Sequence, residues 1–149
     1  GWELVLGRRD AERAFALAQA AGDEADAARA LIARGAIEQK EGDVDAAVAT
    51  MSNAADRFRS LGDLGGLGEA LRRRGMVEIF GNRIPDAEAS AEAALAAFQE
   101  VGDRAGQAWA SQNLAWCAFI SGRPDEADQR LQDAIEMFGE LIDTQGLAW

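Results

Sequence analysis

The 149-residue chain is long enough for one domain with a substantial core, and 48% of its residues are hydrophobic. Its 26 acidic and 15 basic residues give a formal net charge of -11, which argues against nucleic acid as a partner because it repels a phosphate backbone. The sequence has no histidine and no tyrosine, so the commonest general base and zinc ligand are missing, and we expect no catalytic residues, no metal and no cofactor.

The chain repeats itself at an interval of 40 residues. A Gly-Asp pair stands at 22–23, 62–63 and 102–103, and Ile142-Asp143 occupies the same place once more. Superposed at this interval, three sets of residues coincide without a gap: Ala47, Ala87 and Ala127; Ala54, Ala94 and Ala134; and Phe58, Phe98 and Phe138. The repeat predicts a succession of similar structural units.

Taken in chain order, the units divide the sequence completely. Residues 1–22 match the second half of a unit, complete units follow at 23–62, 63–102 and 103–142, and residues 143–149 match the beginning of another. Each unit of a stacked array buries its apolar side only against its neighbours. We therefore expect a single repeat domain that is a fragment of a longer array.

Each complete unit is predicted to be a helical hairpin. The first helices are expected at about 23–40, 63–80 and 103–120. The second helix of the third unit carries Ala127, Leu131, Ala134, Ile135 and Phe138 in one amphipathic stripe. Gly, Asp and Pro residues separate the two helices of each unit and act as breakers.

A cluster of glycines at 62–68 raises the alternative of a phosphate-binding loop. Its spacing matches neither the dinucleotide fingerprint nor the P-loop, which also needs a Lys-Ser/Thr pair. We interpret Gly62-Asp63 as a helix corner, in which glycine takes the left-handed conformation and aspartate caps the next helix. Gly65, Gly66 and Gly68 are interpreted as small residues that let neighbouring helices approach closely.

The two-helix unit, with small residues at fixed points, resembles the tetratricopeptide repeat. At the family's pattern positions the third unit has Ser111, Leu114, Ala115, Ala118, Ala127, Leu131 and Ala134. The 40-residue interval is similar to the longer repeats of scaffold proteins and of bacterial signalling proteins linked to a cyclase or an ATPase. The resemblance implies an all-α fold, a right-handed α-solenoid of antiparallel helical hairpins.

Two charged pairs depart from the family's pattern. Arg34 with Glu38, and Arg74 with Glu78, stand where the family usually has apolar or aromatic residues. Each pair has i, i+4 spacing and is expected to form an ion pair on a helix surface, worth a few tenths of a kcal/mol. We expect the first two units to pack less tightly at this point.

The resemblance also implies a groove for a peptide, lined by the first helices on the concave side. The candidate peptide-binding residues are Arg72, Arg73, Met76, Trp109, Gln112, Asn113 and Trp116. The arginines would bind carboxylates, the amides a peptide backbone and the tryptophans an apolar anchor. Two alternatives stay open: the tryptophans fill the seam between helices, and the arginines are a solvated surface.

The remaining expectations concern the partner and the location. The lone Cys117 aligns with Ile37 and Val77 and is expected to be a buried thiol. No apolar run is long enough for a bilayer, and no secretory signal is present, so we expect a cytoplasmic protein without membrane contact. The predicted function is noncatalytic binding of a protein or peptide, which includes another domain of the same chain. The alternative is a regulatory or self-associating segment of a bacterial signalling protein, and hence a homo-oligomer.

Overall fold

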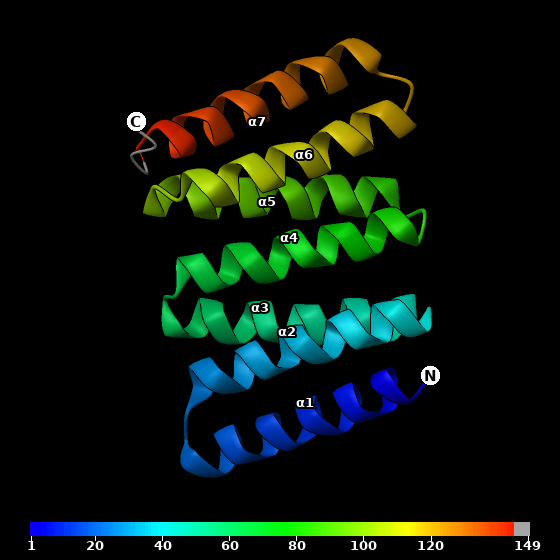
Figure 1. Cartoon of the computed structure of the whole chain (residues 1–149), viewed down its shortest axis with the longest axis vertical. Coiled ribbons are helices and arrows are strands. Elements are labelled where there is room, and N and C mark those ends of the chain that lie inside the picture. The colour runs from blue at the N-terminus through cyan, green and yellow to red at the C-terminus, as the bar shows by residue number, and fades with distance from the viewer. Residues whose placement is uncertain (145–149) are drawn as a thin grey trace.

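The computed structural model describes residues 1–144, with side chains through Ile142, and this part of the chain is helical without any strand (Figure 1). The helices are α1 (Trp2–Ala21), α2 (Glu24–Glu41), α3 (Val44–Leu61), α4 (Leu64–Phe80), α5 (Ile84–Val101), α6 (Arg104–Ile120) and α7 (Pro124–Thr144). The all-α prediction is confirmed, and the first helices α2, α4 and α6 begin and end within about a residue of their expected bounds.

The helices stack in one row, in which each packs against the next in the sequence (Figure 1). The first helix of each hairpin also contacts the first helix of the neighbouring hairpins, as α4 contacts α2 and α6. Within residues 1–144, the second helices α3, α5 and α7 do not contact one another. Because the first helices lie closer together, the α-solenoid is concave on the side of α2, α4 and α6.

The repeated Gly-Asp pairs form the corners between hairpins, as expected. Gly62 has a φ of 69°, in the left-handed region that favours glycine. The N–H of Asp63 donates to the carbonyl oxygen of Phe58 at 3.0 Å. Its carboxylate accepts from the N–H of Gly66 at 2.8 Å, which caps the first turn of α4.

The chain differs from this pattern at Ile142. The expected corner at 142–143 does not form, and α7 continues through Thr144. The other corners have glycine at this position, whereas a β-branched residue strongly disfavours the left-handed conformation. The further first helix expected from residue 143 lies, from residue 145 on, outside the described residues.

Phenylalanine rings packed against glycines join successive hairpins. A Cβ atom at Gly106 would stand 2.3 Å from Cδ1 of Phe98, and one at Gly66 would stand 2.2 Å from Cδ1 of Phe58. A Cβ atom at Gly68 would stand 2.8 Å from Cε1 of Phe98, on the same ring. The interpretation of Gly66 and Gly68 as sites of close approach is confirmed. Gly65 differs, because the only atom near its Cβ position belongs to the side chain of Asp63, at 3.6 Å.

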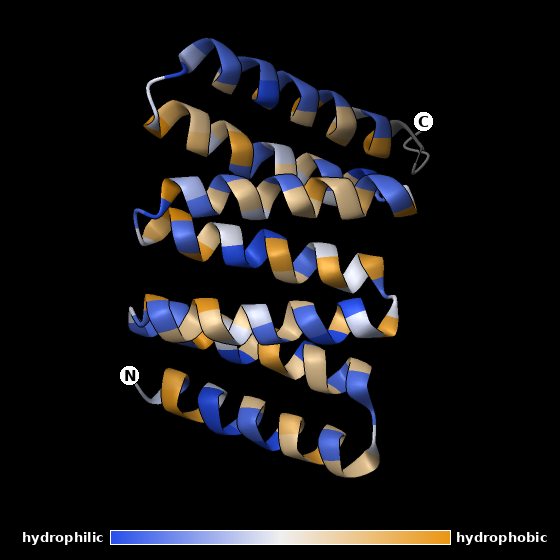
Figure 2. Cartoon of the chain, turned by 180° about the vertical axis from the view of Figure 1, so that it is seen from behind, coloured by the Kyte–Doolittle hydropathy of each residue, from blue (hydrophilic) through white to orange (hydrophobic). Residues whose placement is uncertain are grey.

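The core lies between the helices, along the whole stack. Its largest cluster includes Leu31, Phe58, Leu71, Phe98 and Ala110, which come from five consecutive helices. Every helix carries both hydrophobic and hydrophilic residues (Figure 2). This mixed composition fits helices that are buried on their packed sides and exposed on the others.

Both charged pairs of the first two units form ion pairs, as expected, but their carboxylates are buried and not on the helix surface. Glu38 is only 1% exposed and Glu78 only 4%. Nε of Arg34 donates to Oε1 of Glu38 at 2.7 Å, while the other oxygen of Glu38 is buried without a hydrogen bond. Each pair thus brings a carboxylate into the interior, where the cost of losing water makes its partners important.

Serine hydroxyls complete the second of these pairs. Ser90 donates to Oε2 of Glu78 at 2.6 Å and accepts from Nε of Arg74 at 3.0 Å. A second nitrogen of Arg74 donates to Ser52 at 3.3 Å. Burial raises the pKa of Glu78, although the hydrogen bond from Ser90 and the charge of Arg74 oppose this shift. The cluster connects α3, α4 and α5.

Candidate functional site

The candidate residues lie on α4 and α6, two of the helices that line the concave side, but they differ in exposure. Trp109 and Trp116 are 45% and 50% exposed, and Arg73, Met76 and Gln112 are partly exposed. These five residues form one accessible surface across the two helices. The face arises because residues three, four and seven positions apart share one side of a helix.

The two arginines of this surface are already bound to a carboxylate of the same helix. Arg72 donates two hydrogen bonds to the carboxylate of Glu69, at 2.9 and 3.0 Å, and Arg73 donates to the same group. Burial would raise the pKa of Glu69, but hydrogen bonds and charge from both arginines outweigh it and lower the pKa. The guanidinium of Arg72 also lies 5.9 Å from the ring centre of Trp109.

Asn113 does not belong to the accessible surface, which corrects its place among the candidates. Its side chain is 1% exposed, and its amide donates to the backbone carbonyl of Arg72 at 2.9 Å. The bond ties α6 to α4. Gln112, its neighbour in sequence, is partly exposed because consecutive helical residues point about 100° apart.

The two tryptophans have different roles in the packing. The ring of Trp109 meets the ring of Phe138 edge-on, with centroids 5.2 Å apart, so it fills part of the seam between α6 and α7. Trp116 contacts Phe119 of its own helix, with centroids 6.4 Å apart. Among the described side chains, Trp116 therefore makes no ring contact with another helix, in contrast to Trp109.

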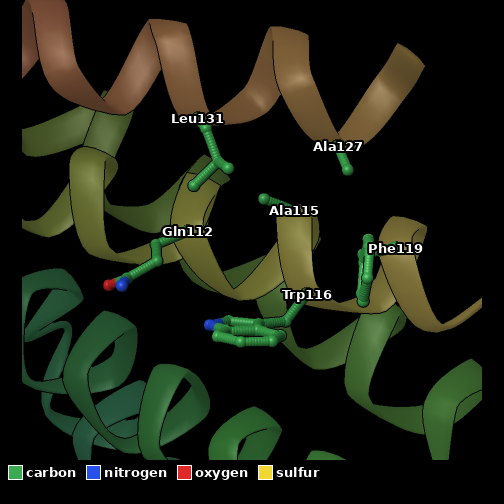
Figure 3. A pocket seen from close by; sticks show the side chains of 6 residues that line it. All are labelled: Gln112, Ala115, Trp116, Phe119, Ala127 and Leu131. Atoms are coloured by element: carbon green, nitrogen blue, oxygen red, sulfur yellow. The ribbon is translucent and has the colours of Figure 1, made fainter. Parts of the chain in front are cut away.

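Trp116 borders a pocket of about 290 Å³ between α6 and α7 (Figure 3). Its lining residues are Gln112, Ala115, Trp116, Phe119, Ala127 and Leu131. Figure 3 shows Trp116 and Phe119 projecting from α6, with Leu131 and Ala127 above them on α7. Apart from Gln112 the lining is apolar, so the pocket suits an apolar group.

Three further residues, Glu69, Phe80 and Ile120, lie on the same helical face and extend this surface. Phe80 and Ile120 are exposed at the C-terminal ends of α4 and α6, one repeat apart. Each stands four residues after Met76 or Trp116, on the same helical face. Glu69 holds both arginines, which stand three and four residues after it on α4. The concave surface thus has an apolar half and a charged half.

The cysteine of the chain does not reach this surface. Cys117 is fully buried, and burial, together with the charge of Glu88, raises its pKa to about 11. Among the residues that the structure describes, no cluster of metal-ligating side chains occurs. None of the described helices combines the length and apolarity that a membrane span requires. The features of the surface that a ligand could contact are its apolar pocket, its aromatic rings and its hydrogen-bond donors.

Comparisons with known proteins agree with the fold. Residues 67–140 match the family model of the tetratricopeptide repeat. The crystal structure of BtubC (BKLC) from P. vanneervenii superposes with a TM-score of 0.82 at 16% identity, over 93% of this chain and 58% of that chain. The chain thus spans little more than half of BtubC, and the likeness concerns the fold alone. No curated protein matches the sequence.

Tetratricopeptide repeats are in general noncatalytic modules of protein–protein interaction. The matched residues include α5, α6 and most of α4 and α7, and hence the pocket and the concave surface described above. On the match over residues 67–140 and the α-solenoid fold, the chain belongs to the tetratricopeptide repeat family.

Proposed function

We propose that this chain is a noncatalytic interaction module that holds a peptide segment of a partner protein on the concave surface of α4 and α6. The observation that carries the proposal is an apolar set at matching positions of two adjacent helices, in which Phe80, Trp116 and Ile120 are exposed and Met76 is partly exposed. Exposed aromatic and apolar side chains that lie together commonly mark an interface. They would bury an apolar side chain of the partner.

The charged half of the surface determines which polar groups the partner segment needs. One nitrogen of Arg73 is bonded to Glu69, and its side chain is 42% exposed. A guanidinium has five N–H donors, so Arg73 retains donors for a carboxylate or a peptide carbonyl. Arg72 is more deeply packed and positions the cluster. A segment with an acidic or carbonyl group beside its apolar anchor fits this arrangement.

The test uses the 149-residue chain as bait, followed by calorimetry with the captured partner and its minimal peptide. Trp116→Ala and Met76→Ala should each weaken binding, because truncation of a central anchor costs about 2 kcal/mol or more, roughly thirtyfold in affinity. Arg73→Ala should weaken it less. Trp2→Ala is the matched control, since Trp2 is exposed on α1, far along the stack. Unchanged binding by folded Trp116→Ala and Met76→Ala variants would rule out the concave surface.

A second candidate function is self-association within a larger signalling protein. Exposed apolar side chains at both ends of the stack favour it, such as Leu17 on α1 and Ile135 on α7. Sedimentation velocity at increasing concentration tests this function. A chain that stays monomeric at the highest soluble concentration would count against self-association.

A further inference from the structure

A groove of about 370 Å³ opens between α2 and α4 on the concave side, in the interior of the stack. Ile32 and Phe58 give this α2–α4 groove an apolar lining. Its charged lining consists of Arg29, Asp63, Glu69 and Arg73. Both walls have their neighbours in the described chain, because α2 packs against α1 and α3, and α4 against α3, α5 and α6. The shape of the groove therefore does not depend on the ends of the stack.

The two carboxylates of the groove are already engaged within the chain. Asp63 caps the first turn of α4 through the bond that it accepts from Gly66. Glu69 accepts from Arg72 with both of its oxygens, and from Arg73 with one of them. These carboxylates thus have partners that belong to the same helix.

The two arginines of the groove, by contrast, keep N–H donors for a ligand. Arg29 donates to Asp26 of its own helix at 2.6 Å, but both side chains are 61% exposed, so water screens the pair and holds it weakly. Arg73 is 42% exposed and is bonded to Glu69 through Nε, which leaves the donors of its two terminal nitrogens. The groove thus presents N–H donors from two adjacent helices.

The distribution of charge along the chain favours the concave side for an acidic partner. The first helices α2, α4 and α6 carry seven basic and six acidic residues, a net charge of +1. The second helices α3, α5 and α7 carry three basic and thirteen acidic residues, a net charge of -10, which is nearly all of the formal charge of -11. An acidic segment is thus repelled by the second helices and not by the groove.

We propose that the α2–α4 groove binds an acidic side chain of the partner's peptide segment, whose carboxylate accepts hydrogen bonds from Arg29 and Arg73 together. This assignment rests on the proposed concave-surface function and names the chemistry of the segment that the surface holds. Glutamate fits best, because its methylene groups lie against the apolar lining at Ile32 while its carboxylate reaches the arginines. The carboxylate at the end of a chain has no such apolar stem.

The same surface fixes where the apolar residue of the segment stands. Arg73 precedes Phe80 by seven residues on α4, a distance of about 10 Å along the helix axis. An extended peptide spans this distance with about three residues, at roughly 3.3 Å each. We therefore expect an acidic and an apolar residue at this spacing in the segment.

The probe is a random peptide library displayed on phage and selected on the immobilised 149-residue chain. The selected sequences should share an acidic residue about three positions from an apolar one. A selected peptide, labelled at its N-terminus and amidated at its C-terminus, is then measured by fluorescence anisotropy. Replacement of its acidic residue by the matching amide should weaken binding by about tenfold, because a hydrogen-bonded charge is lost.

Arg29→Gln and Arg73→Gln test the two donors in the chain. Each should weaken binding of the acidic peptide by about tenfold and hardly affect the amide peptide, since both changes remove the same contact. Arg59→Gln is the matched control and should leave the affinity unchanged. Arg59 pairs with Asp56 at 2.6 Å and is 59% exposed, much as Arg29 pairs with Asp26, but it lies on α3. Circular dichroism checks that each variant is folded.

Three results would overturn this proposal and leave the concave-surface function intact. The first is a set of selected peptides that lose binding in Met76→Ala but show no acidic preference. The second is affinity for the acidic peptide that persists unchanged in both arginine variants. The third is equal affinity for a shortened peptide that ends, with a free carboxylate, at the place of the acidic residue, because the groove would then recognise a chain end. Selection of no peptide by the folded chain would overturn both proposals.

Discussion

Gly106→Ala tests whether the phenylalanine–glycine contact fixes the spacing between hairpins. The new methyl group would stand 2.3 Å from Cδ1 and 2.5 Å from Cγ of Phe98, so a ring held on both sides has to move. Overpacking of this kind costs about 1–3 kcal/mol. Alanine is better than glycine in a helix by about 0.5–1 kcal/mol, which offsets part of the cost. We expect a net loss of roughly 1 kcal/mol in unfolding free energy.

The sign of this effect should reverse when the ring is absent. Phe98→Ala alone should destabilise the chain by about 3–5 kcal/mol, because it leaves a cavity in the core. In that background Gly106→Ala should stabilise by up to about 1 kcal/mol, since only the helix propensity remains. Gly65→Ala is the matched control, because the atom nearest its Cβ position is a side-chain oxygen at a comfortable 3.6 Å.

The assay is urea unfolding followed by circular dichroism, with the four variants of the double-mutant cycle measured together. The two substitutions should be non-additive by about 2 kcal/mol, a large fraction of the 5–15 kcal/mol typical of a domain. If Gly106→Ala stabilises the otherwise unchanged chain as much as Gly65→Ala does, the ring does not restrict this position. The account of the stack in terms of these contacts would then be wrong.

Three further predictions concern buried polar groups. Cys117, with its raised pKa of about 11, should not react with a disulfide reagent at pH 8 until urea unfolds the chain. Burial raises the pKa of Glu78 in the folded state, so the folded chain binds this proton more tightly than the unfolded chain. The unfolding free energy should therefore fall as pH rises from the ordinary pKa of glutamate through the raised pKa of Glu78. In a plot of unfolding free energy against pH, Glu78→Gln should flatten this part. Asn113→Ala should cost about 1–2 kcal/mol in urea unfolding, because it removes the bond to the Arg72 carbonyl.

The repeat made most of the fold predictable from sequence. The positions of Gly62, Asp63 and Phe58 recur at a constant interval, and each has one local role: left-handed corner, helix cap or core ring. These roles depend on residues a few positions away, so periodicity is enough to assign them. The corner predicted at Ile142 does not form because it relied on the 40-residue interval alone. The glycine that has the local role at this position is replaced by isoleucine.

The site was less predictable because it depends on contacts between helices. Helical spacing alone does not show which of Gln112 and Asn113 is exposed, because the two side chains point about 100° apart and both lie near the edge of the predicted face. Burial of Asn113 follows from the position of α4, which lies 41 residues away along the chain at the contact. Likewise, i, i+4 spacing predicts an ion pair for Glu78 but does not reveal that Ser90 and α5 cover it.

Because Phe58 meets Gly66 as Phe98 meets Gly106, one hairpin can be exchanged for the next without changing the kind of contact at the joint. Removal of residues 63–102 would place Phe58 against Gly106 and rejoin Gly62 to Asp103 in the same corner. The molecule is therefore extensible: its length can grow or shrink by whole hairpins through duplication or deletion. A change of any other size would rotate the faces out of alignment, so length in such an array varies in steps.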